Sequence, residues 1–141
     1  MNFKINTSEK FTTVTPETDS LTDSLTEQLI KQLKQYLTKE VHNVVLNMKN
    51  IKHCSAECVE KISDLQQDFY ENNASLVLCE VQPHVYAVIE KLEMEDVMNM
   101  TPTESEAWDI LQMEEIEREL LDEEEPLFND FEEEEEDEYE D

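Results

Sequence analysis

Apolar residues along the chain change their spacing several times, from alternation with polar residues to a helical period and back. Over the first 14 positions they alternate with polar residues, which predicts two short strands joined near residues 8–10. Leucine then recurs at every fourth position from 25 to 37, the spacing of an amphipathic helix. Ser24 and Glu27 have the spacing of a capping box and are expected to begin this helix. The apolar positions of the two strands are Phe3, Ile5, Phe11 and Val14.

The middle of the chain alternates between short apolar runs and helical patterns. Residues 44–48 and 76–81 are runs of the length of buried strands, and residues 97–100 predict a last strand. The Asn72–Asn73 pair is expected to end the second helix, because asparagine tolerates the left-handed backbone found at helix ends. The helical positions between the runs are Val59, Ile62, Leu65 and Phe69, followed by Val85, Val88, Ile89 and Leu92.

A last helix is predicted from the sequence that follows the last strand. Thr101 is the expected cap, Pro102 occupies the first helical position and Glu104 closes the capping box. Apolar residues continue the helix to about Leu121. The resulting order is ββαβαβαβα, with about four helices. Strands that alternate with helices imply right-handed crossovers, so we expect an α/β domain over residues 1–121 with a mixed, mostly parallel sheet and one antiparallel edge.

Charge divides the chain into two parts. Residues 122–141 contain 14 acidic and no basic residues, and such a segment buries too little apolar surface to fold, which predicts a disordered acidic tail. The remaining 121 residues hold 23 acidic and 10 basic residues, so the domain is acidic as well. This charge argues against binding to nucleic acids or anionic membrane surfaces and favours a basic protein partner.

Composition excludes several other classes of function. Glycine is absent, so neither the glycine-rich dinucleotide loop nor the Walker A loop can form. No apolar run approaches the roughly 18 residues of a membrane span, and the start of the sequence lacks the apolar core of a signal peptide. Three cysteines suit the reducing cytoplasm, where we expect the protein to act.

The segment from His53 to Cys58 has the most varied chemistry. His53, Cys54 and Cys58 are conceivable metal ligands, but a fourth ligand is not evident and the cysteines are better interpreted as small buried side chains. Ser55 is a good helix cap, and Glu57 suits the positive end of a helix. Since no catalytic nucleophile–base pair is visible either, we expect a non-enzymatic protein without metal or cofactor.

Four stretches of the sequence resemble the STAS domain of bacterial anti-sigma factor antagonists. They are LTDSLTEQL at 21–29, VVLNMKNI at 44–51, LVLCEVQP at 76–83 and MEEIEREL at 113–120. The order of the expected elements resembles that family as well. Members of the family bind a serine kinase that also serves as an anti-sigma factor, so the resemblance implies a regulatory module with a partner of that type.

The resemblance also implies a phosphorylation site from which this sequence departs. The family pattern Asp-Ser-Ser-Gly at the start of the second helix falls on Ser55, Ala56, Glu57 and Cys58. Glu57 therefore occupies the phosphoacceptor position, and it has no hydroxyl to phosphorylate. The usual switch, in which phosphorylation of one serine releases the partner, is not expected to carry over.

The start of the second helix is the partner-binding surface that the resemblance implies, and the proposed topology places two further loops at the same edge. An alternative function is an acidic decoy that binds a basic partner through its C-terminal tail. The residues expected to bind the partner are Asp19, Ser20, Leu21, Thr22, Ser55, Ala56, Glu57, Cys58, Val59, Val81, Gln82 and Pro83.

Overall fold

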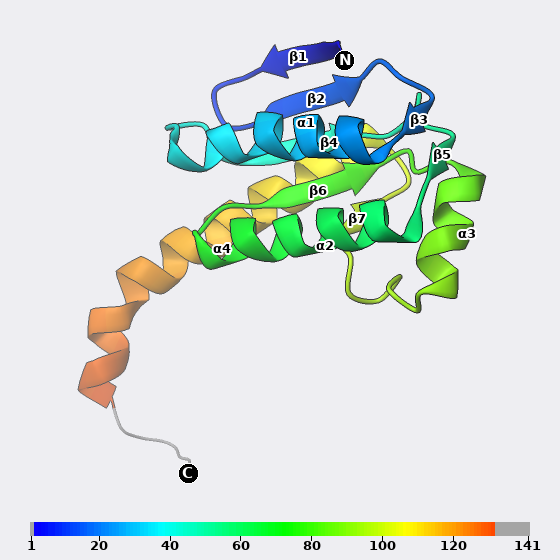
Figure 1. The fold of residues 1–141 in the computed structure, drawn as a ribbon. Helices are drawn as coiled ribbons and strands as arrows, with labels where there is room; N and C mark the ends of the chain where they lie inside the picture. The colour runs from blue at the N-terminus through cyan, green and yellow to red at the C-terminus, as the bar shows by residue number, and fades with distance from the viewer. Residues whose placement is uncertain (1, 132–141) are drawn as a thin grey trace.

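A five-stranded sheet with helices on both faces forms the centre of the structure (Figure 1). This computed structural model describes the backbone of residues 2–131 and the side chains of residues 2–121. The strand order is β1-β2-β4-β6-β7, in which only the β1–β2 pair at one edge is antiparallel. The predicted mostly parallel sheet is thus confirmed. The strands are β1 Phe3–Thr7, β2 Thr12–Pro16, β4 Val44–Asn47, β6 Leu76–Cys79 and β7 Met100–Thr101.

Four α-helices connect or follow these strands in the predicted order. Helices α1 and α2 lie on one face of the sheet, α4 lies on the other face, and α3 stands at one end (Figure 1). A short second sheet, which the sequence did not predict, pairs β3 (Ser20–Leu21) with β5 (His53–Cys54). The helices are α1 Asp23–Lys34, extended by the 3-10 turn η1 Gln35–Thr38, then α2 Ala56–Glu71, α3 Pro83–Lys91 and α4 Glu104–Phe131.

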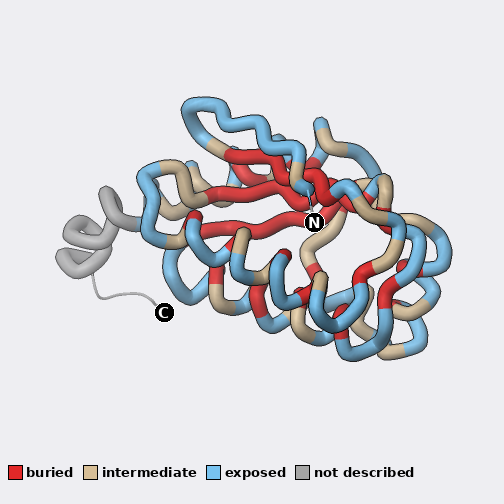
Figure 2. The backbone as a smooth tube through the Cα atoms, turned by 45° about the horizontal axis from the view of Figure 1, so that its top comes forward, coloured by how far each residue is buried: buried red, intermediate tan, exposed pale blue. Residues whose placement is uncertain are grey.

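The core is divided by the sheet, because successive side chains of a strand point to opposite faces. In β4, Val44 and Leu46 pack into the larger cluster with α1 and α2, whereas Val45 packs with Ala107 and Leu111 of α4. Strands β2, β4 and β6 are buried along their whole length and form the red centre of Figure 2. Burial on both faces explains the apolar runs of β4 and β6, whereas β2 buries three threonines, Thr12, Thr13 and Thr15.

Helix α1 begins earlier than the capping box predicted. The side chain of Thr22 accepts a hydrogen bond from the backbone N–H of Leu25 at 3.2 Å, so Thr22 is the cap and Ser24 lies within the helix. Thr22 has an extended backbone, and its carbonyl accepts the N–H of Thr26. The Ser24–Glu27 interpretation was therefore wrong by two residues.

Helix α4 begins later than predicted, for a reason that lies outside the helix. Thr101 belongs to β7 and pairs with Cys79, so its backbone is committed to the sheet and cannot cap. Thr103 caps instead, and its side chain accepts the backbone N–H of Glu106 at 3.2 Å. Glu106, rather than Glu104, completes this arrangement through a 2.8 Å bond from the Thr103 hydroxyl.

The last strand is also displaced from its predicted position. Val97 was expected to begin it, but this residue is 70% exposed and its N–H bonds to the carbonyl of Met94 in a turn. Glu93 just before this turn has φ 57, which ends α3 and redirects the chain. The strand consequently starts only at Met100.

Helix α4 continues beyond the predicted end near Leu121 to Phe131, into the acidic segment. Glutamate is a good helix former, which is consistent with this extension. Residues 132–141 of the predicted tail lie outside the described residues. Among the helices that are described, none combines the length and apolar character needed to cross a membrane.

Candidate functional site

The loop before α1 and the start of α2 are held together by the small β3–β5 sheet. Ser20 pairs with His53, and Leu21 pairs with Cys54. The carbonyl of Asp19 also accepts the backbone N–H groups of Lys52, at 2.7 Å, and of His53, at 3.1 Å. Two of the three segments predicted to bind a partner therefore lie side by side.

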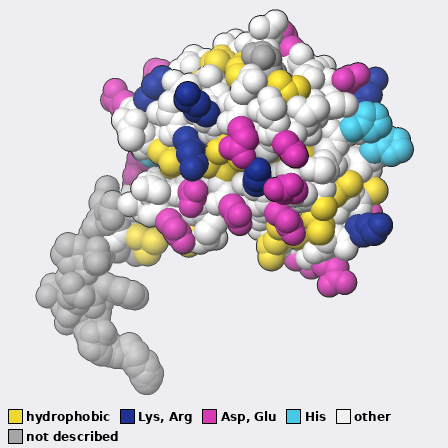
Figure 3. Space-filling view, in the orientation of Figure 1, with side chains coloured by type: hydrophobic (Ala, Val, Ile, Leu, Met, Phe, Trp, Pro, Cys, Tyr) yellow, Lys and Arg dark blue, Asp and Glu magenta, His cyan; other side chains and the backbone are white. Residues whose placement is uncertain are grey.

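Helix α3 brings the third segment to the same end of the molecule. The rings of His53 and His84 stack with their centroids 5.7 Å apart, and Figure 3 shows a patch of histidine side chains at this end. Val81–Pro83 leads directly into α3, for which Gln82 is the N-cap residue. The starts of α1, α2 and α3 thus surround one shallow depression. Its lining residues are Ser20, Leu21, Thr22, His53, Cys54, Ser55, His84 and Val88.

Exposure separates the predicted binding residues into those that can touch a partner and those that support the surface. Leu21, Cys58 and Val59 belong to the core, with exposed fractions of 4%, 1% and 1%. Ser20, Val81 and Gln82 are half-buried. The exposed members are Asp19, Thr22, Ser55, Ala56, Glu57 and Pro83. His53 and His84 are exposed here too, although the sequence did not single them out as partner-binding residues.

Ser55 caps α2 as the sequence predicted. Its hydroxyl accepts the backbone N–H of Cys58 at 3.1 Å, and its own backbone is extended. Ala56 and Glu57 consequently occupy the first turn, where backbone N–H groups and the helix dipole favour negative charge.

The carboxylate of Glu57 is directed along α2 towards a lysine. Its nearer oxygen lies 3.8 Å from the Nζ of Lys61, which also contacts Glu27 of α1 at 2.7 Å. The hydrogen bond from Lys61 lowers the pKa of Glu27, and the same bond raises the pKa of Lys61. The charge of Glu57 is therefore shared within a small ion-pair group rather than left free.

The two cysteines of this segment interact with each other. A hydrogen bond from Cys54 lowers the pKa of the Cys58 thiol, whereas this bond, together with burial, raises the pKa of Cys54. Both thiols belong to the main core cluster. In the part of the chain whose side chains are described, His53, Cys54 and Cys58 do not bring three ligand atoms within 4.8 Å of one another.

The arrangement of these elements matches a known family. The family model of the STAS domain matches residues 9–107, well over half of the chain. The chain belongs to the STAS domain family. No curated protein sequence matches it significantly.

Solved structures with the same fold include three described as anti-sigma factor antagonists. An antagonist domain protein from Planctomyces limnophilus has 14% identity and a TM-score of 0.64, with 78% of this chain and 97% of that chain covered. A putative antagonist from Thermotoga maritima has 12% identity and a TM-score of 0.68, covering 78% and 94%. Unphosphorylated SpoIIAA has 16% identity and a TM-score of 0.63, covering 79% and 96%. At these identities the likeness shows the fold alone.

A polar cluster that the sequence did not reveal lies at the strand ends of this STAS domain. The buried amide of Asn47 donates to Glu80 at 3.2 Å and to Glu104 at 2.8 Å. Ligand atoms of Cys79, Glu80 and Glu104 lie within 4.8 Å of one another, close enough to hold a metal ion. Burial and the two carboxylates raise the pKa of Cys79 to about 12, so its thiol keeps its proton at neutral pH. The Asn47 amide is hydrogen-bonded to both carboxylates, so Glu80 and Glu104 already have a partner in the folded protein.

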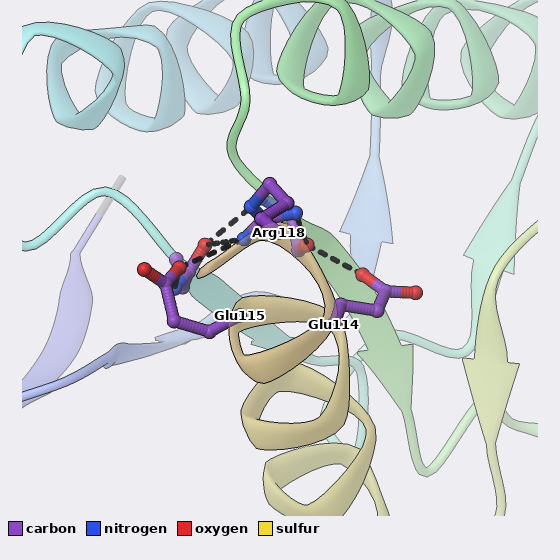
Figure 4. Close-up of polar contacts among 5 residues, drawn as sticks. Glu114, Glu115 and Arg118 are labelled. Carbon is purple, nitrogen blue, oxygen red and sulfur yellow. Dashed lines mark hydrogen bonds and ion pairs between the residues drawn. The ribbon is translucent and has the colours of Figure 1, made fainter. Parts of the chain in front are cut away.

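A second polar network attaches α4 to the opposite ends of the strands. Arg118 donates to Glu115 at 2.9 Å and to the side chains of Asn43 and Ser75 at 3.1 Å each (Figure 4). Asn43 and Ser75 immediately precede β4 and β6, so the guanidinium joins the helix to both central strands. Glu114 adds a hydrogen bond from Ser75 on the other side of the helix (Figure 4). This network positions α4 and leaves its outer face to solvent.

Proposed function

We propose that this STAS domain is a non-enzymatic regulatory module that acts like an anti-sigma factor antagonist in the cytoplasm. Its partner is a protein of the anti-sigma factor and serine kinase type. The observation that carries the proposal is the convergence of the starts of α1, α2 and α3 on one exposed surface. Three structural neighbours described as anti-sigma factor antagonists support the same class of function.

The surface has the properties of a recognition site. Its exposed groups come from the starts of three helices, and Leu21, Cys58 and Val59 pack into the core beneath them. The stacked histidines add large planar side chains between β5 and α3. Preformed surfaces of this kind bind with little loss of conformational freedom.

A pair of variants tests the position of this surface. Ala56→Lys places a long cation in the first turn of α2, whereas Gln67→Lys adds the same charge at another exposed position of the same helix. With the co-purifying partner identified by mass spectrometry, we expect Ala56→Lys to weaken binding at least about tenfold, which is ~1.4 kcal/mol. Gln67→Lys should stay within about threefold of the wild type by calorimetry. Equal effects of the two variants would place the contact elsewhere.

An acidic decoy remains the alternative, because the last 20 residues carry 14 acidic side chains. The same calorimetry with residues 122–141 deleted separates the two functions. Binding that survives deletion supports the helix starts, whereas binding that disappears supports the tail.

We further propose that this surface lacks the serine phosphorylation switch. Glu57 offers no hydroxyl, and its single charge, partly neutralised by Lys61, imitates the nearly doubly charged phosphoserine poorly. Ser55 is the nearest hydroxyl residue along the sequence, but it is engaged as the helix cap. Incubation with the captured kinase and ATP should therefore leave the intact mass unchanged. A stoichiometric phosphoryl adduct on Ser55 would contradict the proposal.

A further inference from the structure

We propose that the outer face of α4, together with the groove beside it, is a second docking surface, whose occupant is a basic amphipathic helix of another protein. This surface is separate from the helix starts described above, because α4 lies on the other face of the sheet and extends beyond it at the end away from α3 (Figure 1). The proposal does not depend on the function proposed for those helix starts.

Exposed apolar side chains are concentrated on this helix. Of the nine large hydrophobic residues exposed among residues 2–121, five belong to α4. Met113, Ile116 and Leu120 are 61%, 53% and 48% exposed and follow one another at helical spacings of three and four. They form a continuous line of about two turns, roughly 10 Å long at 1.5 Å per residue. The inner face of the helix packs against the sheet through Ala107 and Leu111, which are both buried.

Acidic side chains flank the line of apolar residues. At about 100° per residue, Glu117 falls on one side of it and Glu119 on the other. Both carboxylates are exposed, and neither takes part in an ion pair within residues 2–121. An apolar stripe bordered by unpaired carboxylates is complementary to a helix whose apolar stripe is bordered by Lys or Arg.

A groove of about 260 Å³ runs beside this stripe, between α4 and the β1–β2 hairpin. Phe11, Leu111 and Ile116 supply its apolar wall. Four carboxylates surround it, against the single lysine Lys10 and the imidazole of His42. A Lys or Arg of the docked helix fits this groove, because its aliphatic stem covers the apolar wall while its cation reaches the rim. The four carboxylates belong to Glu9, Glu40, Glu115 and Glu119.

Charge selects this occupant over the other candidates. A second copy of a chain with net charge −27 is repelled, and residues 104–121 alone hold seven acidic residues against Arg118. Nucleic acids and anionic lipid surfaces are repelled for the same reason. A basic helix gains both apolar burial and charge complementarity.

The test uses the full chain and a synthetic 18-residue peptide with Leu at helical spacing and Lys on both flanks. One control peptide has the same composition in scrambled order, and another has Glu in place of Lys. At about 0.15 M salt, where surface charges are screened beyond ~8 Å, we expect the patterned Lys peptide to bind at least about tenfold more tightly than the scrambled one. Methyl NMR shifts should centre on Met113, Ile116 and Leu120.

Two sets of variants locate the contact. Ile116→Ser with Leu120→Ser should remove the preference for the patterned peptide, whereas the matched exposed pair Tyr70→Ser with Val97→Ser should keep it. Glu117→Lys with Glu119→Lys should weaken binding of the Lys peptide and strengthen binding of the Glu peptide, each by roughly tenfold. Since all six side chains are exposed, the variants should melt like the wild type.

Three results would overturn the proposal. Equal affinity for the patterned and scrambled peptides would mean that the acidic residues of the protein attract any cationic peptide, whatever its pattern. Shifts confined to other elements would place the contact away from α4. A dimer of the protein alone, dissolved by the Ile116 and Leu120 substitutions, would make a second copy the occupant.

Discussion

Replacement of Phe69 by alanine is expected to lower the free energy of unfolding by about 3–5 kcal/mol. Phe69 lies in the last turn of α2 and is 0% exposed. It is the largest of the fully buried side chains among the described residues. Removal of its ring deletes apolar contacts and leaves a cavity that the surrounding strands cannot fill, because the sheet is fixed by its hydrogen bonds. Urea unfolding followed by circular dichroism measures the change.

Tyr70 provides the matched control for this prediction. It is the next residue of the same helix, also aromatic, and 73% exposed. Tyr70→Ala should change the free energy of unfolding by no more than about 0.5 kcal/mol. Because domains of this size are stabilised by only about 5–15 kcal/mol, loss of Phe69 removes a large fraction of the total. Similar losses from both variants would show that α2 is not oriented as described.

The second large effect is expected for Arg118→Met, which should cost about 1.5–3 kcal/mol. Methionine keeps the apolar stem but removes the donors to Glu115, Asn43 and Ser75. Asn43 and Ser75 are themselves buried, so their polar atoms lose partners that water replaces poorly. Lys91→Met, which removes a cation from the exposed surface of α3, is the control and should be nearly neutral.

The pH dependence of this variant gives an independent check. The hydrogen bond from Asn43, followed by Arg118, lowers the pKa of Glu115. A lowered folded-state pKa means that its stabilisation is present above the unfolded pKa of about 4.3 and is lost as the pH falls through the folded value. Without Arg118 the pKa of Glu115 should rise. Because the unfolded pKa is the same in both proteins, the acid-induced loss of melting temperature should be smaller in Arg118→Met than in the wild type.

The order of the elements was predictable because each depends on a local period. Buried strands such as Val44–Asn47 form apolar runs, and helix α2 places Val59, Ile62, Leu65 and Phe69 on one face. The β3–β5 sheet was not predictable, because each strand has two residues and no period to detect. The caps were ambiguous for a different reason. More than one Thr or Ser precedes α1 and α4, and the pairing of β7 with β6 decides that Thr101 is unavailable.

Only the part of the candidate site that is covered by the resemblance to the family could be predicted from the sequence. The start of α2 could be aligned, and the capping role of Ser55 followed from its position. The contact of His53 with His84 joins residues on different elements, so no spacing along the sequence predicts it. Arg118 and its partners Asn43 and Ser75 are likewise far apart in the chain.

The absence of glycine has a consequence for the entropy of folding. Asn73, Glu80 and Glu93 adopt left-handed backbone angles, with φ of 59°, 53° and 57°, at turns where glycine is the usual residue. Each of the two glutamates costs roughly 1–2 kcal/mol of local strain. An unfolded chain without glycine, however, samples fewer conformations, so less freedom is lost when it becomes ordered. The domain therefore carries strain at a few turns while the ordering of the remaining backbone costs less than it does in a glycine-rich chain.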